Sequence, residues 1–264
     1  MKHFILLGVL LIFCACNETS DTNMMVSYSM DETIEDQIPD QNFRTAILEM
    51  GYLLDTDADF SISQEELAAF EGALVLADKQ IQSLNGLELF TNITALYCQE
   101  NQLTSLDVTA NENLEILSCT KNQLSDLDLS ANEDIITLYC QENDLQTLDL
   151  SFNSVLNYLD CSENQLTELV LPKNHLMEEI RCHDNQLAAL DLTQNERILH
   201  VHAHNNALTS LDIYANYTLN NLSVYGNPDL TCVRVSNMNG FFDIFFSNWY
   251  YDTQTTFSES CTGN

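Results

Sequence analysis

Oxygen-bearing side chains between residues 55 and 66 are the part of the sequence best suited to chemistry. Acidic and hydroxyl residues occur there mostly at alternate positions, in the order Asp55, Asp57, Asp59, Ser61, Ser63 and Glu66. Hard oxygen donors at this spacing can surround one Ca²⁺, and the Glu66 carboxylate can close the shell with both of its oxygens. The sequence therefore predicts a calcium site of structural character.

This segment resembles the 12-residue loop of EF-hands, with Asp55 at the first position and Glu66 at the twelfth. In that resemblance Ser61 contributes its backbone carbonyl. Phe60 departs from the pattern, because EF-hands have glycine there in a left-handed turn and another residue costs about 1–2 kcal/mol. The alternative is an acidic loop that only caps the helix after it.

Helices are expected on both sides of this loop. Residues 38–51 contain an early proline, apolar residues at helical spacing and a final glycine, and residues 65–70 are helix-forming. We therefore expect a small helical cap over residues 37–80.

Histidines form a second group that could bind a metal. His200, His202 and His204 alternate along one expected strand, and His183 lies 21 residues before His204. On a straight strand the outer two of the three are about 13 Å apart, too far for one tetrahedral zinc ion. A His183–His204 pair is more feasible, but no nucleophile elbow, phosphate loop or HExxH motif accompanies it. We therefore expect neither zinc nor an enzyme.

A 21-residue period organises most of the chain. Six uninterrupted units begin at Ile93, the first reading ITALYCQENQLTSLDVTANEN, with a partial copy from Leu219 and a degenerate one at residues 81–84. A unit this short cannot bury its own apolar row, so successive units must stack. Apolar ladders at the fourth and fourteenth positions then line the core over residues 81–227.

Two other repeated positions have structural interpretations. Asparagine recurs at the ninth position, where a primary amide can bridge the backbone groups that a turn leaves unpaired: Asn101, Asn122, Asn143, Asn164, Asn185 and Asn206. Cysteine recurs at the sixth position: Cys98, Cys119, Cys140, Cys161 and Cys182. In-register side chains point the same way, so buried free thiols are expected rather than disulfides. A soft-metal or redox ladder is the alternative.

The pattern LxxLxCxxNxL followed by xxLDLSxN resembles leucine-rich repeats over more than half of the chain. The two halves of each unit are also similar to each other, as in the nested subclass of bacterial leucine-rich repeats. This resemblance implies short strands on both sides of each coil and little helix. We therefore expect a mostly β leucine-rich-repeat solenoid.

Outward strand positions vary while the core does not. Leucine-rich repeats usually bind through this face, and tyrosine, arginine and histidine are common at recognition hot spots. We predict that the third and fifth positions bind a partner through Tyr97, Tyr139, Tyr158, Glu179, Arg181, His200 and His202. The alternative is a solvated face without selectivity. A second outward row, Asp107, Asp128, Asp149, Asp191 and Asp212, is expected to hydrogen-bond the neighbouring turn rather than bind cations.

The N-terminus reads as a secretory signal over residues 1–16, since the apolar run at residues 4–13 is too short to span a membrane. Ala15 before Cys16 resembles the lipobox of bacterial lipoproteins, although Phe13 stands where leucine is usual. This implies a lipidated Cys16 on the bacterial outer membrane or cell surface. The alternative is ordinary cleavage that leaves Cys16 a free thiol. Polar residues 17–36 are expected to form a flexible tether.

Residues 228–264 are expected to form a C-terminal cap. Cys232 and Cys261 resemble a cysteine pair in the closing segment of secreted bacterial repeat lipoproteins, which implies a disulfide worth about 3–4 kcal/mol. An apolar cluster is expected to cover the last coil, through Phe241, Phe242, Ile244, Phe245, Phe246 and Trp249.

The net charge of −32 disfavours nucleic acid as a partner. We expect a monomeric, surface-anchored protein that binds a protein or glycan, with internalin-like adhesion as the nearest resemblance. A purely structural envelope spacer is the alternative.

Overall fold

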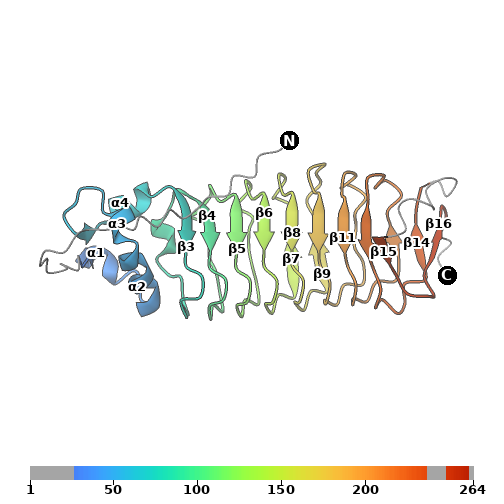
Figure 1. Cartoon of the computed structure of the whole chain (residues 1–264), viewed down its shortest axis with the longest axis horizontal. Coiled ribbons are helices and arrows are strands. Elements are labelled where there is room, and N and C mark those ends of the chain that lie inside the picture. The colour runs from blue at the N-terminus through green and yellow to red at the C-terminus, as the bar shows by residue number, and fades with distance from the viewer. Residues whose placement is uncertain (1–26, 237–247, 262–264) are drawn as a thin grey trace, which may run out of the picture.

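The computed structural model describes residues 27–236 and 248–261. Strands stacked side by side form an elongated solenoid, and a group of helices closes its N-terminal end (Figure 1). The mostly β leucine-rich-repeat architecture expected from the 21-residue period is therefore confirmed.

The N-terminal cap contains four short helices and one two-stranded sheet. Its elements are β1 (Ser29–Met30), α1 (Glu32–Glu35), α2 (Gln41–Glu49), α3 (Gly51–Leu54), β2 (Ser61–Ile62) and α4 (Gln64–Ala69). The Asp40 carboxylate begins α2 by accepting hydrogen bonds from the amides of Asn42 and Phe43. Both helices expected beside the acidic loop are therefore present.

The expected tether extends too far into the chain. Residues 27–36 belong to the cap, because β1 pairs in parallel with β2 and the side chain of Ile34 is fully buried. Polar neighbours hide these few apolar side chains when composition is averaged over residues 17–36. The signal peptide, Cys16 and the start of the tether lie outside the described residues.

One parallel sheet of nine strands runs along the solenoid. Its strands are β3 (Gly72–Val75), β4 (Ile93–Tyr97), β5 (Ile116–Ser118), β6 (Thr137–Tyr139), β8 (Tyr158–Asp160), β10 (Glu179–Arg181), β11 (His200–His202), β13 (Asn221–Ser223) and β15 (Trp249–Tyr250). The register pairs equivalent positions of successive units, for example Leu96 with Leu117. Since β3 pairs with β4, the coils begin before residue 81, where the sequence placed their start.

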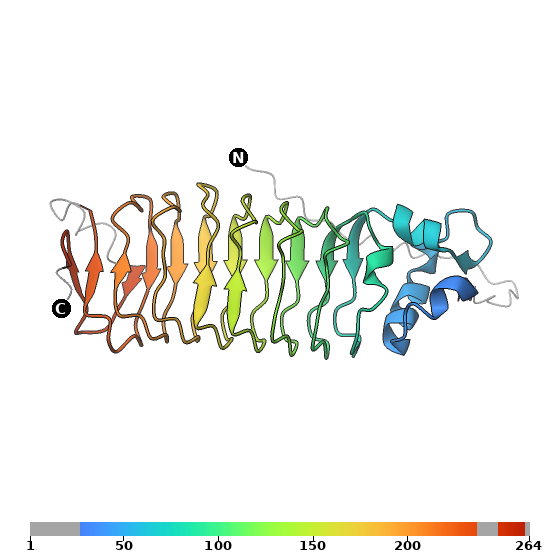
Figure 2. The same cartoon turned by 180° about the vertical axis from the view of Figure 1, so that it is seen from behind.

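In the described part of the chain the opposite side of the coils carries fewer strands, seen from behind in Figure 2. They are β7 (Thr147–Asp149), β9 (Glu168–Val170), β12 (Leu211–Asp212), β14 (Cys232–Arg234) and β16 (Thr256–Ser258). β7 pairs with β9, and β14 lies between β12 and β16. Strands on both sides of the coils were expected. In addition, β15 extends the nine-stranded sheet, and β14 and β16 extend the strands of the opposite side, into the segment predicted to be a cap.

Stacked identical positions form the core. The fourth-position ladder from Leu96 to Val201 and all five sixth-position cysteines are fully buried. The cysteines are free thiols, as expected, and burial raises the pKa of Cys119 and Cys182 to about 12. They pack as small apolar side chains.

Asparagine amides join successive coils, as predicted. Asn143 donates from Nδ2 to the carbonyls of Cys119 and Cys140 at 3.0 and 3.1 Å, and its Oδ1 accepts from the Leu124 amide at 3.0 Å. A second buried ladder on the other side of the coils was not recognised from the sequence: Asn111, Asn132, Asn153, Asn174, Asn195 and Asn216. Asn132, for example, donates from Nδ2 to the carbonyls of Val108 and Asn111 in the preceding coil at 3.0 and 2.9 Å, but its Oδ1 accepts no hydrogen bond from the described residues.

A disulfide between Cys232 and Cys261 closes the C-terminal end, as the resemblance implied. It joins β14 to the residues just after β16. Trp249 lies in β15 and its ring contacts that of Phe257, with centroids 5.5 Å apart. The other members of the predicted apolar cover, residues 241–246, lie outside the described residues.

Candidate functional site

The outward surface of the nine-stranded sheet, here called the strand face, carries the predicted partner-binding residues. All seven of them are half-buried, because in-register side chains of neighbouring coils lie against each other. Strand pairing aligns the fifth positions in one column: Val75, Tyr97, Ser118, Tyr139, Asp160, Arg181, His202, Ser223 and Tyr250. Small or short side chains in this column are buried between larger ones.

The middle of the strand face is an ordered aromatic and charged cluster. The rings of Tyr139 and Tyr158 lie 5.1 Å apart, and the Arg181 guanidinium lies 5.9 Å from the centre of the Tyr158 ring. Glu179 accepts a 2.7 Å hydrogen bond from Nε of Arg181. Burial raises the pKa of Tyr158 to about 12, so its hydroxyl stays neutral and able to donate.

Sequence reasoning did not identify the residues at the two ends of the strand face. Val75 on β3 and Tyr250 on β15 are 54% and 59% exposed. The alternation Leu74-Val75-Leu76 repeats the pattern of residues 96–98 and could have revealed the first coil. Tyr250 lies outside the 21-residue spacing, so only strand pairing places it.

A hollow lies near the C-terminal end of the strand face. It has a volume of about 300 Å³ and is lined by His202, Asn221, Leu222, Ser223, Tyr225, Asn248 and Tyr250. Burial lowers the pKa of His202, which favours the neutral imidazole. Aromatic faces and amide groups therefore line this hollow, and none of its side chains is acidic.

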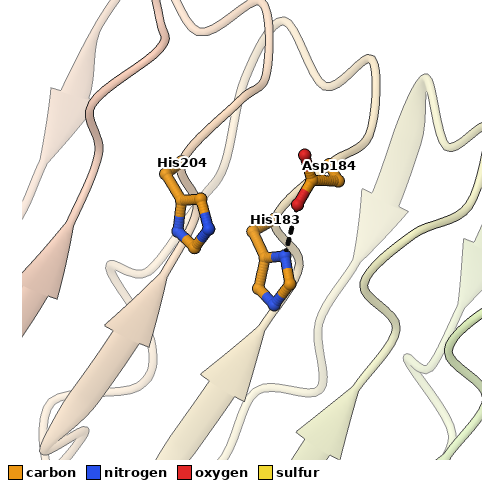
Figure 3. Close-up of side chains that lie close together, drawn as sticks. All are labelled: His183, Asp184 and His204. Carbon is orange, nitrogen blue, oxygen red and sulfur yellow. Dashed lines mark hydrogen bonds and ion pairs between the residues drawn. The ribbon is translucent and has the colours of Figure 1, made fainter.

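Two of the four histidines considered in the sequence meet at the edge of the strand face. The rings of His183 and His204 stack with centroids 4.4 Å apart and planes 9° from parallel. Asp184 was not included in the sequence reasoning. Its carboxylate oxygen Oδ2 lies 2.7 Å from Nδ1 of His183, where it can accept a hydrogen bond (Figure 3). His200 and His202 lie on the outer side of β11, His200 in the column of third positions and His202 in the column of fifth positions.

The acidic loop brings three of its six predicted ligands together. Carboxylate oxygens of Asp55, Asp57 and Asp59 lie within 4.8 Å of one another. Asp55 accepts hydrogen bonds from the amides of Ala58 and Phe60, at 2.7 and 3.0 Å, which folds the loop around its carboxylate. The backbone hydrogen bond from Asp59 lowers the pKa of Asp57, but burial and the adjacent carboxylates raise it more.

Phe60 has a φ of +68°, so the left-handed conformation that glycine favours is present with a phenylalanine in it. Its carbonyl accepts a 3.0 Å hydrogen bond from the Ser29 amide, and its ring lies 6.1 Å from that of Tyr28. The β1 segment thus supports the strained position.

Glu66 and Ser63 also serve the helix after the loop. They form a capping box at the start of α4, and the other Glu66 oxygen accepts a 2.6 Å hydrogen bond from the Thr56 amide. Burial acts to raise the pKa of Glu66, but the hydrogen bonds from Ser63 and Thr56 lower it more. Three carboxylates therefore fit a hard cation, while Glu66 would have to exchange cap contacts for metal contacts.

The row of outward aspartates on the opposite side of the coils stabilises turns, as expected. Asp107 accepts from the amide and hydroxyl of Thr109 at 3.0 and 2.7 Å, and Asp191 does the same with Thr193. Hydrogen bonding with the threonine lowers the pKa of both aspartates.

In the part of the chain that the structure describes, no helix is long and apolar enough to cross a membrane.

Comparisons with known proteins agree with this architecture. Residues 38–164 match the family of the leucine-rich-repeat domain of the endo-β-N-acetylglucosaminidase EndoS. No curated protein sequence matches the chain.

Three bacterial proteins are among those whose solved structures are similar. Internalin C2 of Listeria monocytogenes is 18% identical with a TM-score of 0.55, over 85% of this chain and 96% of that one. The effector YopM of Yersinia pestis is 23% identical with a TM-score of 0.56, over 79% of this chain and 54% of that one. A leucine-rich-repeat protein of Leptospira interrogans is 20% identical with a TM-score of 0.51, over 74% and 59%. The strand pairing and these similarities together show that the chain has the leucine-rich-repeat solenoid fold of bacterial proteins.

Proposed function

We propose that this protein is a surface-anchored binding protein that recognises a protein partner through the strand face. The observation that carries the proposal is the in-register column of large, half-exposed side chains over an almost constant core. A solenoid built this way can change its recognition residues without disturbing its packing. We place its function in binding and not in catalysis.

The ordered cluster of Tyr139, Tyr158, Glu179 and Arg181 supports a protein partner. Tyrosine and arginine supply much of the affinity of protein interfaces when they are held in place before binding. The guanidinium is already oriented by Glu179 and lies near a ring face, so binding would immobilise few additional rotamers.

A glycan is the second candidate partner, and the hollow between His202 and Tyr250 favours it. Aromatic faces beside amide groups suit the alternating apolar and hydroxyl surfaces of a sugar, and the volume of about 300 Å³ admits a small one. The EndoS enzyme whose repeat domain matches residues 38–164 acts on glycans by name. The present chain is not assigned that activity.

Affinity capture with matched variants tests the function. We expect the purified chain to capture one partner from surface extracts of its native environment, and Tyr97→Ala, Tyr139→Ala and Arg181→Ala combined to abolish capture without lowering the melting temperature. Phe152→Ala is the control, since this exposed aromatic side chain lies outside the strand face. Equal capture by the triple variant would refute a role for this face, and wild-type protein that captures nothing would favour a spacer. A glycan partner would instead be lost with Tyr250→Ala.

We also propose that Cys16 carries the membrane anchor, supported by the sequence that precedes it. Mass spectrometry of the native protein should find a diacylated N-terminal Cys16, and Cys16→Ala should move the protein from the membrane to the soluble fraction. An unmodified thiol at Cys16 would contradict the anchor.

A calcium ion in the acidic loop is a further part of the proposal, as a stabiliser of the N-terminal cap. It is supported by the convergence of Asp55, Asp57 and Asp59. Calorimetric titration with Ca²⁺ should give binding heat for the wild type, none for Asp57→Asn, and weaker binding for Glu66→Gln. Asp144→Asn, an exposed carboxylate on a coil, should bind as the wild type does. Identical heats for wild type and Asp57→Asn would exclude the site.

A further inference from the structure

The seventh position of the repeat changes character near the C-terminal end of the solenoid. Reading down the stack, it is occupied by Gln99, Thr120, Gln141, Ser162, His183, His204 and Tyr225. Neighbouring coils repeat at about 4.8 Å. Two imidazoles in consecutive coils are therefore brought together by the register, and their stacking at 4.4 Å is a direct consequence.

A backbone conformation common to the coils adds a carboxylate to this pair. The residue after the seventh position has positive φ in each of the six units, and at Asp184 the value is +54°. This turn places the Asp184 carboxylate beside the His183 ring, with Oδ2 at 2.7 Å from Nδ1 (Figure 3). The other oxygen, Oδ1, accepts a 2.8 Å hydrogen bond from Nδ2 of Asn205 in the next coil.

The second ring is oriented as well. Nδ1 of His204 lies 3.2 Å from the Ser223 hydroxyl, and its other face stacks on Tyr225 with centroids 4.6 Å apart. Among the described residues, Nε2 of His183 and Nε2 of His204 have no hydrogen-bond partner. An ion held by His183 and Asp184 together would take the place of the proton between Nδ1 and Oδ2, because a carboxylate bonded to Nδ1 cannot also reach an ion on Nε2 of the same ring.

These three side chains suit a borderline-soft divalent ion better than a hard one. Zinc takes imidazole nitrogens and carboxylate oxygens at about 2.0–2.2 Å, which places tetrahedral donors about 3.3 Å apart. Ligand atoms of His183, Asp184 and His204 already lie within 4.8 Å of one another. The remaining difference can be closed by side-chain rotation, because the side chains of His183 and Asp184 are 21% and 43% exposed.

We propose that His183, Asp184 and His204 form a binding site for a divalent transition metal of the zinc class, with solvent completing its shell. The sequence weighed the His183–His204 pair of this site and did not expect zinc there; the structure adds Asp184 as a third donor. The site is separate from the acidic loop, which offers only oxygen donors and lies in the N-terminal cap.

Ion binding requires a visible rearrangement. Lone pairs of parallel stacked rings do not converge on one point, so at least one imidazole must turn out of the stack. The ring signals of His183 and His204 should therefore move on zinc addition, together with that of Tyr225.

Calorimetric titration of the full chain with Zn²⁺, in excess Ca²⁺ to fill any oxygen-only site, tests the proposal. The variants His183→Gln and Asp184→Asn introduce residues that the repeat already carries at equivalent positions, Gln141 and Asn205, so the coil should tolerate them. We expect one zinc ion per chain for the wild type and binding at least about 10-fold weaker for His183→Gln, His204→Gln and Asp184→Asn. His175→Gln is the control, because this exposed side chain lies at a turn and pairs only loosely with Glu196 at 3.9 Å.

Wild-type protein that binds no zinc would overturn the proposal, as would binding that the three variants leave unchanged. Histidine ring signals in NMR spectra of the wild type provide a test that needs no variant. Zinc must shift the signals of His183 and His204 and leave His175 in place, and shifts confined to other histidines would equally refute this site.

Discussion

The buried amide of Asn143 provides a direct test of how the coils are held together. Asn143→Ala removes hydrogen bonds to four backbone groups in two coils: the amide of Leu124 and the carbonyls of Cys119, Cys140 and Gln141. In the variant the carbonyls still accept hydrogen bonds from Asn122, Asn164 and the Lys121 amide, but the Leu124 amide loses its partner at a buried site where water has little access. An unpaired buried polar group costs about 1–3 kcal/mol.

The Leu124 amide is therefore the one backbone group that loses its partner in Asn143→Ala. One such loss gives a destabilisation of about 1–3 kcal/mol. Urea denaturation followed by circular dichroism measures this loss of stability. Gln123→Ala is the control, because the Gln123 side chain is exposed on the coil that contains Leu124. Hydrogen exchange supplies a local readout, since the Leu124 amide should lose protection in the variant.

A destabilisation below about 1 kcal/mol, equal to that of the control, would refute this reasoning. It would mean that backbone relaxation or entering water replaces the amide. Retained protection at Leu124 would lead to the same conclusion. Loss of Leu124 protection with little global effect would instead show that coupling between coils is local, as nearest-neighbour stacking allows.

Three further predictions concern the caps and the core. Because hydrogen bonds from Ser63 and Thr56 hold the pKa of Glu66 below its usual 4.5, this carboxylate contributes stability above that pH and loses it as pH falls through the folded-state pKa. Acid denaturation in EDTA should accordingly be shallower for Glu66→Gln than for the wild type, and parallel curves would contradict the cap contacts. Cys232→Ser opens a loop with a sequence separation of 29 residues and should lower the free energy of unfolding by about 3–4 kcal/mol in denaturant titrations, whereas a loss near zero would mean that strand pairing alone closes this end. Iodoacetamide at pH 8 should leave Cys98, Cys119, Cys140, Cys161 and Cys182 unmodified in the folded protein and label all five after unfolding; labelling before unfolding would show that the ladder is not sealed.

The cap shows where sequence reasoning failed and why. The polar composition of residues 17–36 predicts a tether, yet within it Ile34 is buried and β1 pairs with β2. Average composition cannot reveal the pairing of two strands that lie 32 residues apart, as Ser29 does from Ser61. In the acidic loop the sequence comparison succeeded, since the left-handed turn inferred at Phe60 is present and its strain is accommodated by β1.

The repeat alone determined the stacking, the free cysteines and the ninth-position asparagine ladder, whereas the strands on both sides of each coil followed from the resemblance to nested leucine-rich repeats. A strict period makes every coil bury the same positions, so one sequence carries many copies of the same packing information. The disulfide followed from a resemblance and not from spacing.

Only the tertiary structure decided which outward side chains meet. Register brings Arg181 to Tyr158 and His183 to His204, although each pair is 21 or more residues apart in the chain. The left-handed turn adds Asp184, and the atypical spacing after the last coil brings Tyr250 onto the strand face. Core positions repeat because packing is the same in each coil, whereas contacts on the surface depend on which different residues happen to be neighbours.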